Sequence, residues 1–190
     1  MTTIRFVVRR ATSSDSDAIA QLSQQTWRET YLEDLALPIP DHDVESYLRT
    51  EKSSQWYANK IADPQEATWV MEDTTTGEIV AFVIVGRCEV PHPEFSRNRD
   101  GQIEYLYVRR DRQSQGFGKQ LMNTALSWLE EQFPERPVWL TTLSCNLKSQ
   151  KMYMNYGFTT VGEFISNVGN TERHLIVMRR ESRFAIQNLC

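Results

Sequence analysis

The segment from Gln102 to Leu126 constrains the fold more than any other part of the chain. It begins with a predicted strand (102–108), continues through a polar loop, and ends in a predicted helix whose apolar residues recur at helical spacing. A glycine-containing loop between a strand and a helix is suited to phosphate, because the first N–H groups of a helix have no acceptor within it. Lys119, in the first turn, adds positive charge. The segment therefore predicts an anion-binding loop.

Two common phosphate-binding motifs do not match this loop. A dinucleotide fingerprint requires a third glycine three residues after the second, and Leu121 occupies that position. A P-loop requires a glycine five residues before its Gly-Lys pair and Ser or Thr after it, where this chain has Gln113 and Gln120. What remains is the pattern Q-x-x-G-x-G, formed by Gln113, Gly116 and Gly118 directly after a strand.

Composition excludes several other classes of protein. The chain has 190 residues, of which 40% are hydrophobic and 24% charged, as expected for one globular domain. A net charge of −4 without a basic run argues against a nucleic-acid partner. There is no apolar run of about 20 residues and no signal-peptide pattern, so we expect a cytoplasmic protein without a membrane partner. The cysteines, Cys88, Cys145 and Cys190, show no paired spacing, so we expect neither a disulfide framework nor a metal site.

The remaining segments predict alternating strands and helices. Strands are predicted at 4–10, 68–72, 79–85, 102–108, 138–143, 159–164 and 174–180, and helices follow residues 12–15 and occupy 43–61, 119–133 and 146–157. The strands at 68–72 and 79–85 form a predicted hairpin. We interpret the chain as a single domain, 1–190, in which 181–190 is a short tail.

A second motif lies in the last predicted helix. Asn146, Ser149, Tyr153, Gly157 and Phe158 form the pattern N-x-x-S-x-x-x-Y-x-x-x-G-F. This pattern resembles a signature of the GNAT superfamily of N-acetyltransferases, with Ser149 in place of the usual alanine. The earlier Q-x-x-G-x-G loop resembles the acetyl-CoA pyrophosphate loop of the same family, and the order of the two motifs also agrees. The resemblance extends from about residue 4 to residue 180.

The resemblance implies an α/β (α+β) fold and a cofactor, acetyl-CoA. The implied fold is a mixed, strongly twisted sheet of about seven strands flanked by about four helices, with a V-shaped splay between the fourth and fifth strands. Acetyl-CoA is expected in that V. The residues implied in its binding are Leu106, Tyr107 and Val108 beside the pantetheine arm, Gln113, Ser114, Gln115, Gly116, Phe117, Gly118 and Lys119 around the pyrophosphate, and Asn146, Ser149 and Tyr153 along the arm.

Acetyl transfer to an amine requires a neutral amine, donors for the developing oxyanion, and a proton for the leaving thiolate. Tyr153 stands at the position of the family's general acid. Glu104 lies on the predicted fourth strand, where several family members carry a general base. Strand alternation predicts that Glu104 shares a face with Leu106 and Val108, opposite Ile103, Tyr105 and Tyr107.

The resemblance implies an N-acetyltransferase that acts on the primary amine of a small molecule, such as a polyamine or an amino acid. A protein N-terminal or lysine acetyltransferase and a non-catalytic acetyl-CoA-binding module remain open, as does a homodimer. The residues suggested for the acceptor are Trp27, Glu29, Tyr31 and Glu33. The acidic residues between positions 29 and 51 either attract a cationic acceptor or form a solvated surface.

Overall fold

The structure is a computed structural model that describes residues 5–96 and 99–182. In chain order the strands and longer helices are β1 (Phe6–Arg10), α1 (Ser16–Arg28), α2 (Asp41–Glu51), α3 (Ser54–Ala62), β2 (Glu66–Asp73), β3 (Ile79–Arg87), β4 (Gly101–Val108), α4 (Phe117–Gln132), β5 (Val138–Leu143), α5 (Leu147–Asn155), β6 (Thr159–Val168) and β7 (Thr171–Arg180). A π-helix, η2 (Glu29–Asp34), continues α1. Within the described ranges, no helix combines the length and apolar character that crossing a membrane requires. The start of the first predicted strand and most of the predicted tail (183–190) lie outside the described residues.

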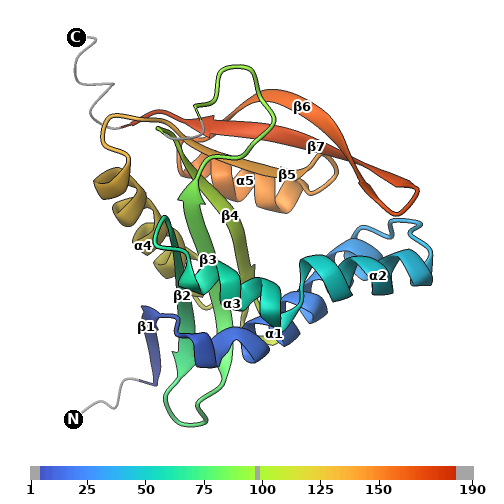
Figure 1. Ribbon diagram of the computed structural model, residues 1–190, viewed down its shortest axis with the longest axis vertical. Helices are drawn as coiled ribbons and strands as arrows, with labels where there is room; N and C mark the ends of the chain where they lie inside the picture. Colours follow the sequence, from blue (N-terminus) through green and yellow to red (C-terminus); the bar gives the residue numbers. More distant parts are fainter. Residues whose placement is uncertain (1–4, 97–98, 183–190) are drawn as a thin grey trace.

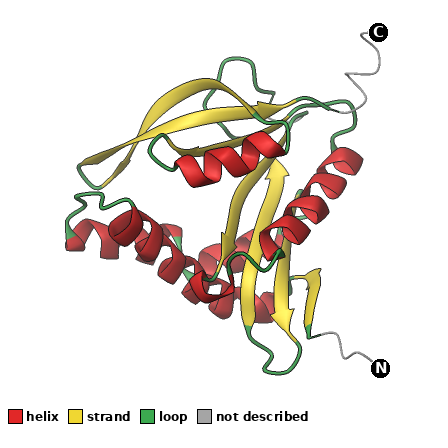
Figure 2. Cartoon of the chain, turned by 180° about the vertical axis from the view of Figure 1, so that it is seen from behind, coloured by secondary structure: helices red, strands yellow, loops and turns green. Residues whose placement is uncertain are grey.

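All seven strands form one mixed sheet in the order β1-β2-β3-β4-β5-β7-β6. Helices α1 and α3 cover one face of its first half, and α4 covers the opposite face (Figures 1 and 2). Each face has its own buried cluster: Ile19, Tyr57 and Phe82 pack together on the α1/α3 face, and Leu121 and Leu129 belong to the cluster on the α4 face. The predicted fold class is confirmed.

The sheet opens between β4 and β5. These strands run parallel and pair only through Gly101–Val138 and Gln102–Trp139, and beyond these pairs the two strands separate (Figure 1). Asp100 fixes the closed end, because its buried carboxylate accepts hydrogen bonds from Arg136 at 2.6 Å and from the Trp139 indole at 3.0 Å. The predicted V-shaped splay is therefore present, and it leaves one backbone edge of β4 without a strand neighbour.

A β-bulge in β4 overturns the predicted facing of Glu104. Ile84 pairs with Tyr105 whereas the next β3 residue, Val85, pairs with Ile103, so Glu104 is an extra residue in its strand. The side chains of Ile103, Leu106 and Val108 consequently pack on the α4 face. Glu104 instead points to the α1/α3 face, together with Tyr105 and Tyr107. Simple alternation was wrong because it assumes that no residue is inserted.

Three other predicted elements differ in extent. The single helix predicted over 43–61 is two helices, because the chain leaves α2 at Lys52 and Ser53 caps α3 by accepting a hydrogen bond from the Trp56 N–H. The last two strands are longer than predicted and meet at a tight turn, so most of the segment between the two predicted strands is paired in this hairpin. The strand predicted at 138–143 and the hairpin of β2 and β3 are confirmed.

Candidate active site

The opening between β4 and β5 is the first part of the candidate site. Leu106, Tyr107 and Val108 form the last residues of β4, past the point where pairing with β5 ends. Their other edge is paired to β3, opposite Val83, Phe82 and Ala81. The backbone groups on the side of the V are therefore placed to bond an extended ligand in the manner of an added strand.

The predicted phosphate loop connects β4 to α4 and keeps its backbone exposed. Ser114 and Gly116 both have positive φ, 62° and 85°, so the loop turns sharply before the helix. Gly116 is the N-cap of α4 and supplies no side-chain capping bond. The N–H groups of the first helical turn are thus left for an anion, which the helix dipole also favours. Gln115 and Lys119 are exposed beside this turn.

Two side chains hold the loop in place. Phe117 is buried against the Phe6 ring, with 4.7 Å between the ring centroids, and this contact anchors the first turn of α4. The Gln113 amide donates to the Val108 carbonyl at 3.3 Å and accepts from the Lys148 amine at 2.8 Å, so it links β4 to α5 across the V.

At Gly118 an added Cβ would lie 3.6 Å from Val108, an ordinary contact. The exposed N–H groups, the absent cap and the open edge of β4 together fit a long ligand with a pyrophosphate, such as acetyl-CoA.

The second motif lies on α5, on the other side of the V. Asn146 caps this helix, because its side chain accepts a hydrogen bond from the Ser149 N–H at 3.1 Å. Both residues are half-buried. Tyr153, two turns from the helix start, is 9% exposed and lies 6.0 Å from Phe158 between ring centroids. Burial raises the pKa of Tyr153 to about 12, and the neighbouring Tyr31 adds to the rise. Its hydroxyl is therefore protonated at neutral pH and can donate a proton.

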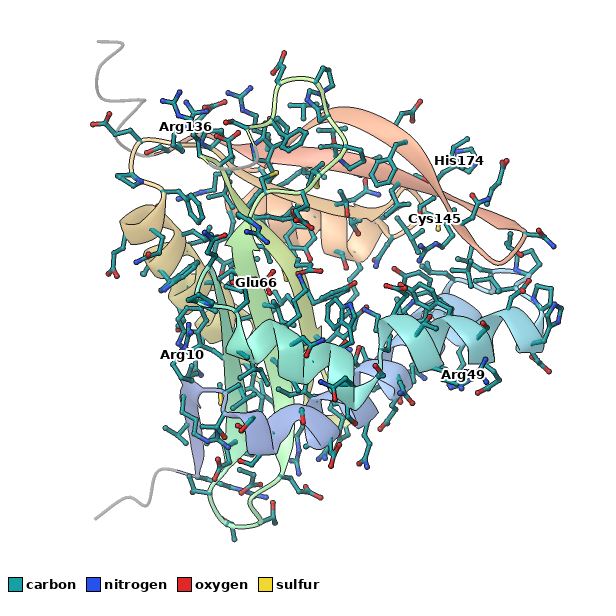
Figure 3. All side chains as sticks on the ribbon, in the orientation of Figure 1. Arg10, Arg49, Glu66, Arg136, Cys145 and His174 are labelled. Carbon is teal, nitrogen blue, oxygen red and sulfur yellow. The ribbon has the colours of Figure 1, made fainter. Side chains whose placement is uncertain are left out.

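Glu104 lies in a small polar cavity on the α1/α3 side of β4. Its carboxylate forms an ion pair of 2.7 Å with Lys60 of α3, which also contacts Glu66 at 2.7 Å. Figure 3 labels Glu66 between the strands and α3. Burial alone would lower the pKa of Lys60, but Glu104 and Glu66 outweigh burial and raise it. The cavity of about 30 Å³ is also lined by Gly86, Arg87, Glu89 and Gln102.

Sequence reasoning missed Lys52, a completely buried lysine on the same face. Its amine lies 3.3 Å from the centroid of the Tyr105 ring and has no hydrogen-bond partner among the described residues. Burial lowers the pKa of Lys52 to about 7, with Glu104 opposing and Arg173 adding to this effect. A signal was present in the sequence, because Val44, Leu48 and Lys52 recur every four residues on the buried face of α2.

Arg173 of β7 was also missed, and it lies beside a predicted acceptor residue. Its guanidinium is 5.9 Å from the centroid of the Tyr31 ring and 5.3 Å from that of Tyr47. Tyr31 itself stacks on the buried Trp27, with 4.5 Å between the ring centroids, so Trp27 supports the Tyr31 ring. Burial raises the pKa of Tyr31 to about 12 and also raises that of Tyr47, while Arg173 opposes both rises. We refer to Tyr31, Tyr47, Lys52, Glu104 and Arg173 as the acceptor-side cluster.

The other predicted acceptor residues have a different environment. Glu29 and Glu33 both reach Arg110, at 3.7 and 2.7 Å, and Asp34 reaches it at 2.8 Å. The structure thus places Glu29 and Glu33 in a shared ion-pair network near the start of the phosphate loop. Across residues 5–96 and 99–182, no group of three or more His, Cys, Asp or Glu side chains is arranged to hold a metal ion.

Solved structures with the same fold include several acetyltransferases. The PaiA N-acetyltransferase of Thermoplasma acidophilum, crystallised with coenzyme A, is 14% identical, with 93% of this chain and 98% of that chain covered at a TM-score of 0.67. A probable acetyltransferase from Staphylococcus epidermidis is 14% identical over the same shares at a TM-score of 0.71. The ribosomal-protein-alanine N-acetyltransferase of Brucella melitensis is 18% identical, with 92% and 99% covered at a TM-score of 0.66.

The sequence itself matches a family model. Residues 19–158, which contain most of the sheet, the phosphate loop and the second motif through Phe158, match the model described as the acetyltransferase (GNAT) family. Enzymes of this family use acetyl-CoA as the acetyl donor, in agreement with the loop and the open V described above. The chain therefore belongs to the GNAT family of acetyltransferases and is an acetyl-CoA-dependent acyltransferase.

Proposed function

We propose that the protein transfers the acetyl group of acetyl-CoA to the primary amine of a small molecule. The observation that carries this proposal is the contact between the turn of the β6–β7 hairpin and α2 (Figure 1). In this proposal the contact closes the acceptor side of the V. An enclosed site suits a small acceptor, whereas a peptide substrate must extend out of the site through an open groove.

The hairpin and α2 are packed together tightly. Val168, at the end of β6, is buried in a cluster with Trp27, Ile39, Val44 and Leu48. Next to it, a Cβ added at Gly169 would lie 2.0 Å from the Asp43 carboxyl carbon. Only a glycine permits this approach, so the turn rests directly on α2. The hairpin therefore limits the size of an acceptor that can enter from this side.

The catalytic roles in this proposal fall to Tyr153 and Glu104. Acetyl-CoA, when bound, supplies an acetyl thioester, whose transfer to an amine forms an amide and releases a thiol. Tyr153 keeps its proton at neutral pH and can give it to the departing thiolate. Glu104, turned by the bulge toward Tyr105 and Tyr107, can accept a proton from the acceptor ammonium directly or through water.

A comparison of free amines with peptides tests the proposal. The release of CoA would be measured with a panel of polyamines, amino acids and simple primary amines, and with peptides that present a free N-terminus or a lysine. We expect turnover of at least one class of free amine and kcat/KM values for peptides that are lower by at least tenfold. Faster acetylation of peptides would favour a protein acetyltransferase. Acetyl-CoA binding without turnover of any amine or peptide would favour the non-catalytic reading.

A further inference from the structure

The acceptor-side cluster contains a buried cation that has no carboxylate partner among residues 5–96 and 99–182. Arg173 is only 9% exposed, and an arginine side chain stays charged at any physiological pH. Its Nη2 donates a hydrogen bond to the Ser166 hydroxyl at 2.9 Å, and its Nε is buried without a hydrogen-bond partner among the described residues. Buried charges are normally paired, so Arg173 lacks the partner that its burial requires.

Two other arginines of the same strand make the contrast clear. Arg180, which is similarly buried, pairs with Glu130 at 3.1 Å. Arg179 pairs with Glu94 and with Glu181, both at 2.9 Å. Within the described part of the chain, Arg173 has no carboxylate oxygen within 4 Å. The nearest candidates in its cluster do not compensate, because Glu104 is already paired with Lys60.

The aromatic neighbours of Arg173 do not neutralise it either. A phenolate at Tyr31 or Tyr47 would serve as a counter-ion, but burial raises the pKa of both phenols, to about 12 for Tyr31. Both side chains are therefore neutral at physiological pH and offer only their ring faces and hydroxyls. Lys52, the other buried basic residue of the cluster, adds positive rather than negative charge whenever its amine is protonated.

We propose, on the basis of the proposed function, that Arg173 binds a carboxylate of the acceptor, so that the preferred substrate is an amino acid rather than a polyamine. A guanidinium presents parallel N–H donors that match the planar carboxylate, and the buried Nε of Arg173 has no hydrogen-bond partner among the described residues. Tyr31, which contacts Arg173, also lies close enough to Tyr153 to affect its pKa. A carboxylate at Arg173 would thus hold the amine of the same molecule on the side of the catalytic tyrosine.

Matched pairs of acceptors test this inference with the wild-type protein. Each amino acid would be compared with its decarboxylated amine and with its amide, for example leucine with 3-methylbutylamine and leucinamide. α- and ω-amino acids, phosphoethanolamine and spermidine would complete the panel. We expect kcat/KM to be about 30-fold or more higher for the carboxylate than for either neutral-tail partner, the usual scale for a buried charge pair. The amide controls for amine basicity, because its amine is less basic than that of the decarboxylated partner.

Variants then assign the preference to one side chain. Arg173→Gln is expected to raise KM for the amino acid by about 30-fold or more and to abolish the preference, with acetyl-CoA affinity by calorimetry unchanged. Arg173→Lys keeps the charge and should retain part of the preference. Arg180→Gln removes a buried arginine of the same strand and should leave the ratio between the paired acceptors as in wild type.

The outcomes distinguish a failure of the carboxylate assignment from a failure of the proposed function. Equal or faster turnover of the decarboxylated amine, the amide or spermidine by the wild-type protein would overturn the carboxylate assignment while leaving a small-molecule acetyltransferase intact. A preference for phosphoethanolamine would overturn it in favour of a phosphoryl group. Turnover of peptides alone would overturn the proposed function, and the carboxylate assignment with it.

Discussion

The amine of Lys52 lies 3.3 Å from the centroid of the Tyr105 ring, beneath the bulged part of β4. Lys52 is completely buried at the end of α2, and the contact with the ring face replaces the water that an exposed ammonium would have. Burial lowers the pKa of Lys52 from its ordinary value of 10.5 to about 7. Burial of Lys52 therefore destabilises the folded protein by an amount that depends on pH.

Replacing Lys52 with methionine should stabilise the protein most at low pH. Below pH 7 the lysine is charged in both the folded and the unfolded state, so the full cost of burying the charge is present. Between pH 7 and about 10.5 the unfolded state binds the additional proton, so the stability of the wild type rises with pH. Near pH 6 we expect Lys52→Met to raise the free energy of unfolding by a few kcal/mol, on the order expected for a buried unpaired charge. This gain should shrink toward pH 10. Urea unfolding of both proteins across this pH range measures the difference in the free energy of unfolding. A gain that does not change with pH would contradict the lowered pKa.

A negative charge at the phosphate loop should abolish acetyl-CoA binding without unfolding the protein. Gly118 has room for a Cβ, 3.6 Å from Val108, so Gly118→Asp is sterically acceptable. Its carboxylate would oppose the pyrophosphate at the first turn of α4. We expect a loss of affinity of at least about 100-fold by calorimetry with an unchanged circular dichroism spectrum. Asn123→Asp, exposed on the same helix, is the matched control. Wild-type affinity in Gly118→Asp would refute the loop assignment.

Removing the hydroxyl of Tyr153 should slow the chemical step. Tyr153→Phe keeps the packing against Phe158, so folding and acetyl-CoA affinity should barely change. We expect kcat to fall by about 10²–10⁴-fold, the usual contribution of a general acid. An acetyl donor with a better leaving group should lose less, because it needs the proton less. Tyr156→Phe, near the end of the same helix, controls for a general effect on α5. Equal losses with both donors would indicate misplacement of acetyl-CoA instead.

Enlarging Gly169 should open the acceptor side. Its φ of 55° and the Asp43 carboxyl group, 2.0 Å from an added Cβ, leave no space for alanine. Gly169→Ala should therefore push the hairpin turn away from α2, raise KM for the best small acceptor and leave acetyl-CoA affinity unchanged. Asp43→Ala in the same chain removes the obstructing side chain and should restore part of the acceptor affinity. Unchanged acceptor KM in Gly169→Ala would mean that this contact does not enclose the acceptor.

Local pattern in the sequence predicted most of the elements and the cofactor loop. The glycines of Q-x-x-G-x-G and the helical spacing after them act within a few residues, so the strand, loop and start of α4 follow from the sequence alone. The second motif has the same character, since Asn146 caps the helix that carries Tyr153. Together these residues identified the family without reference to any distant contact.

The acceptor side depended on tertiary structure. The bulge at Glu104 exists because β3 and β4 pair across an inserted residue, and alternation along one strand contains no information about that insertion. Arg173 and Tyr31 are far apart in the chain and meet only when the β6–β7 hairpin closes on η2 and α2. That no described carboxylate lies beside Arg173 is likewise a property of the assembled neighbourhood. Sequence thus predicted the loop proposed to bind acetyl-CoA, because that loop is local, whereas the acceptor-side cluster is built from side chains that only the packed fold brings together.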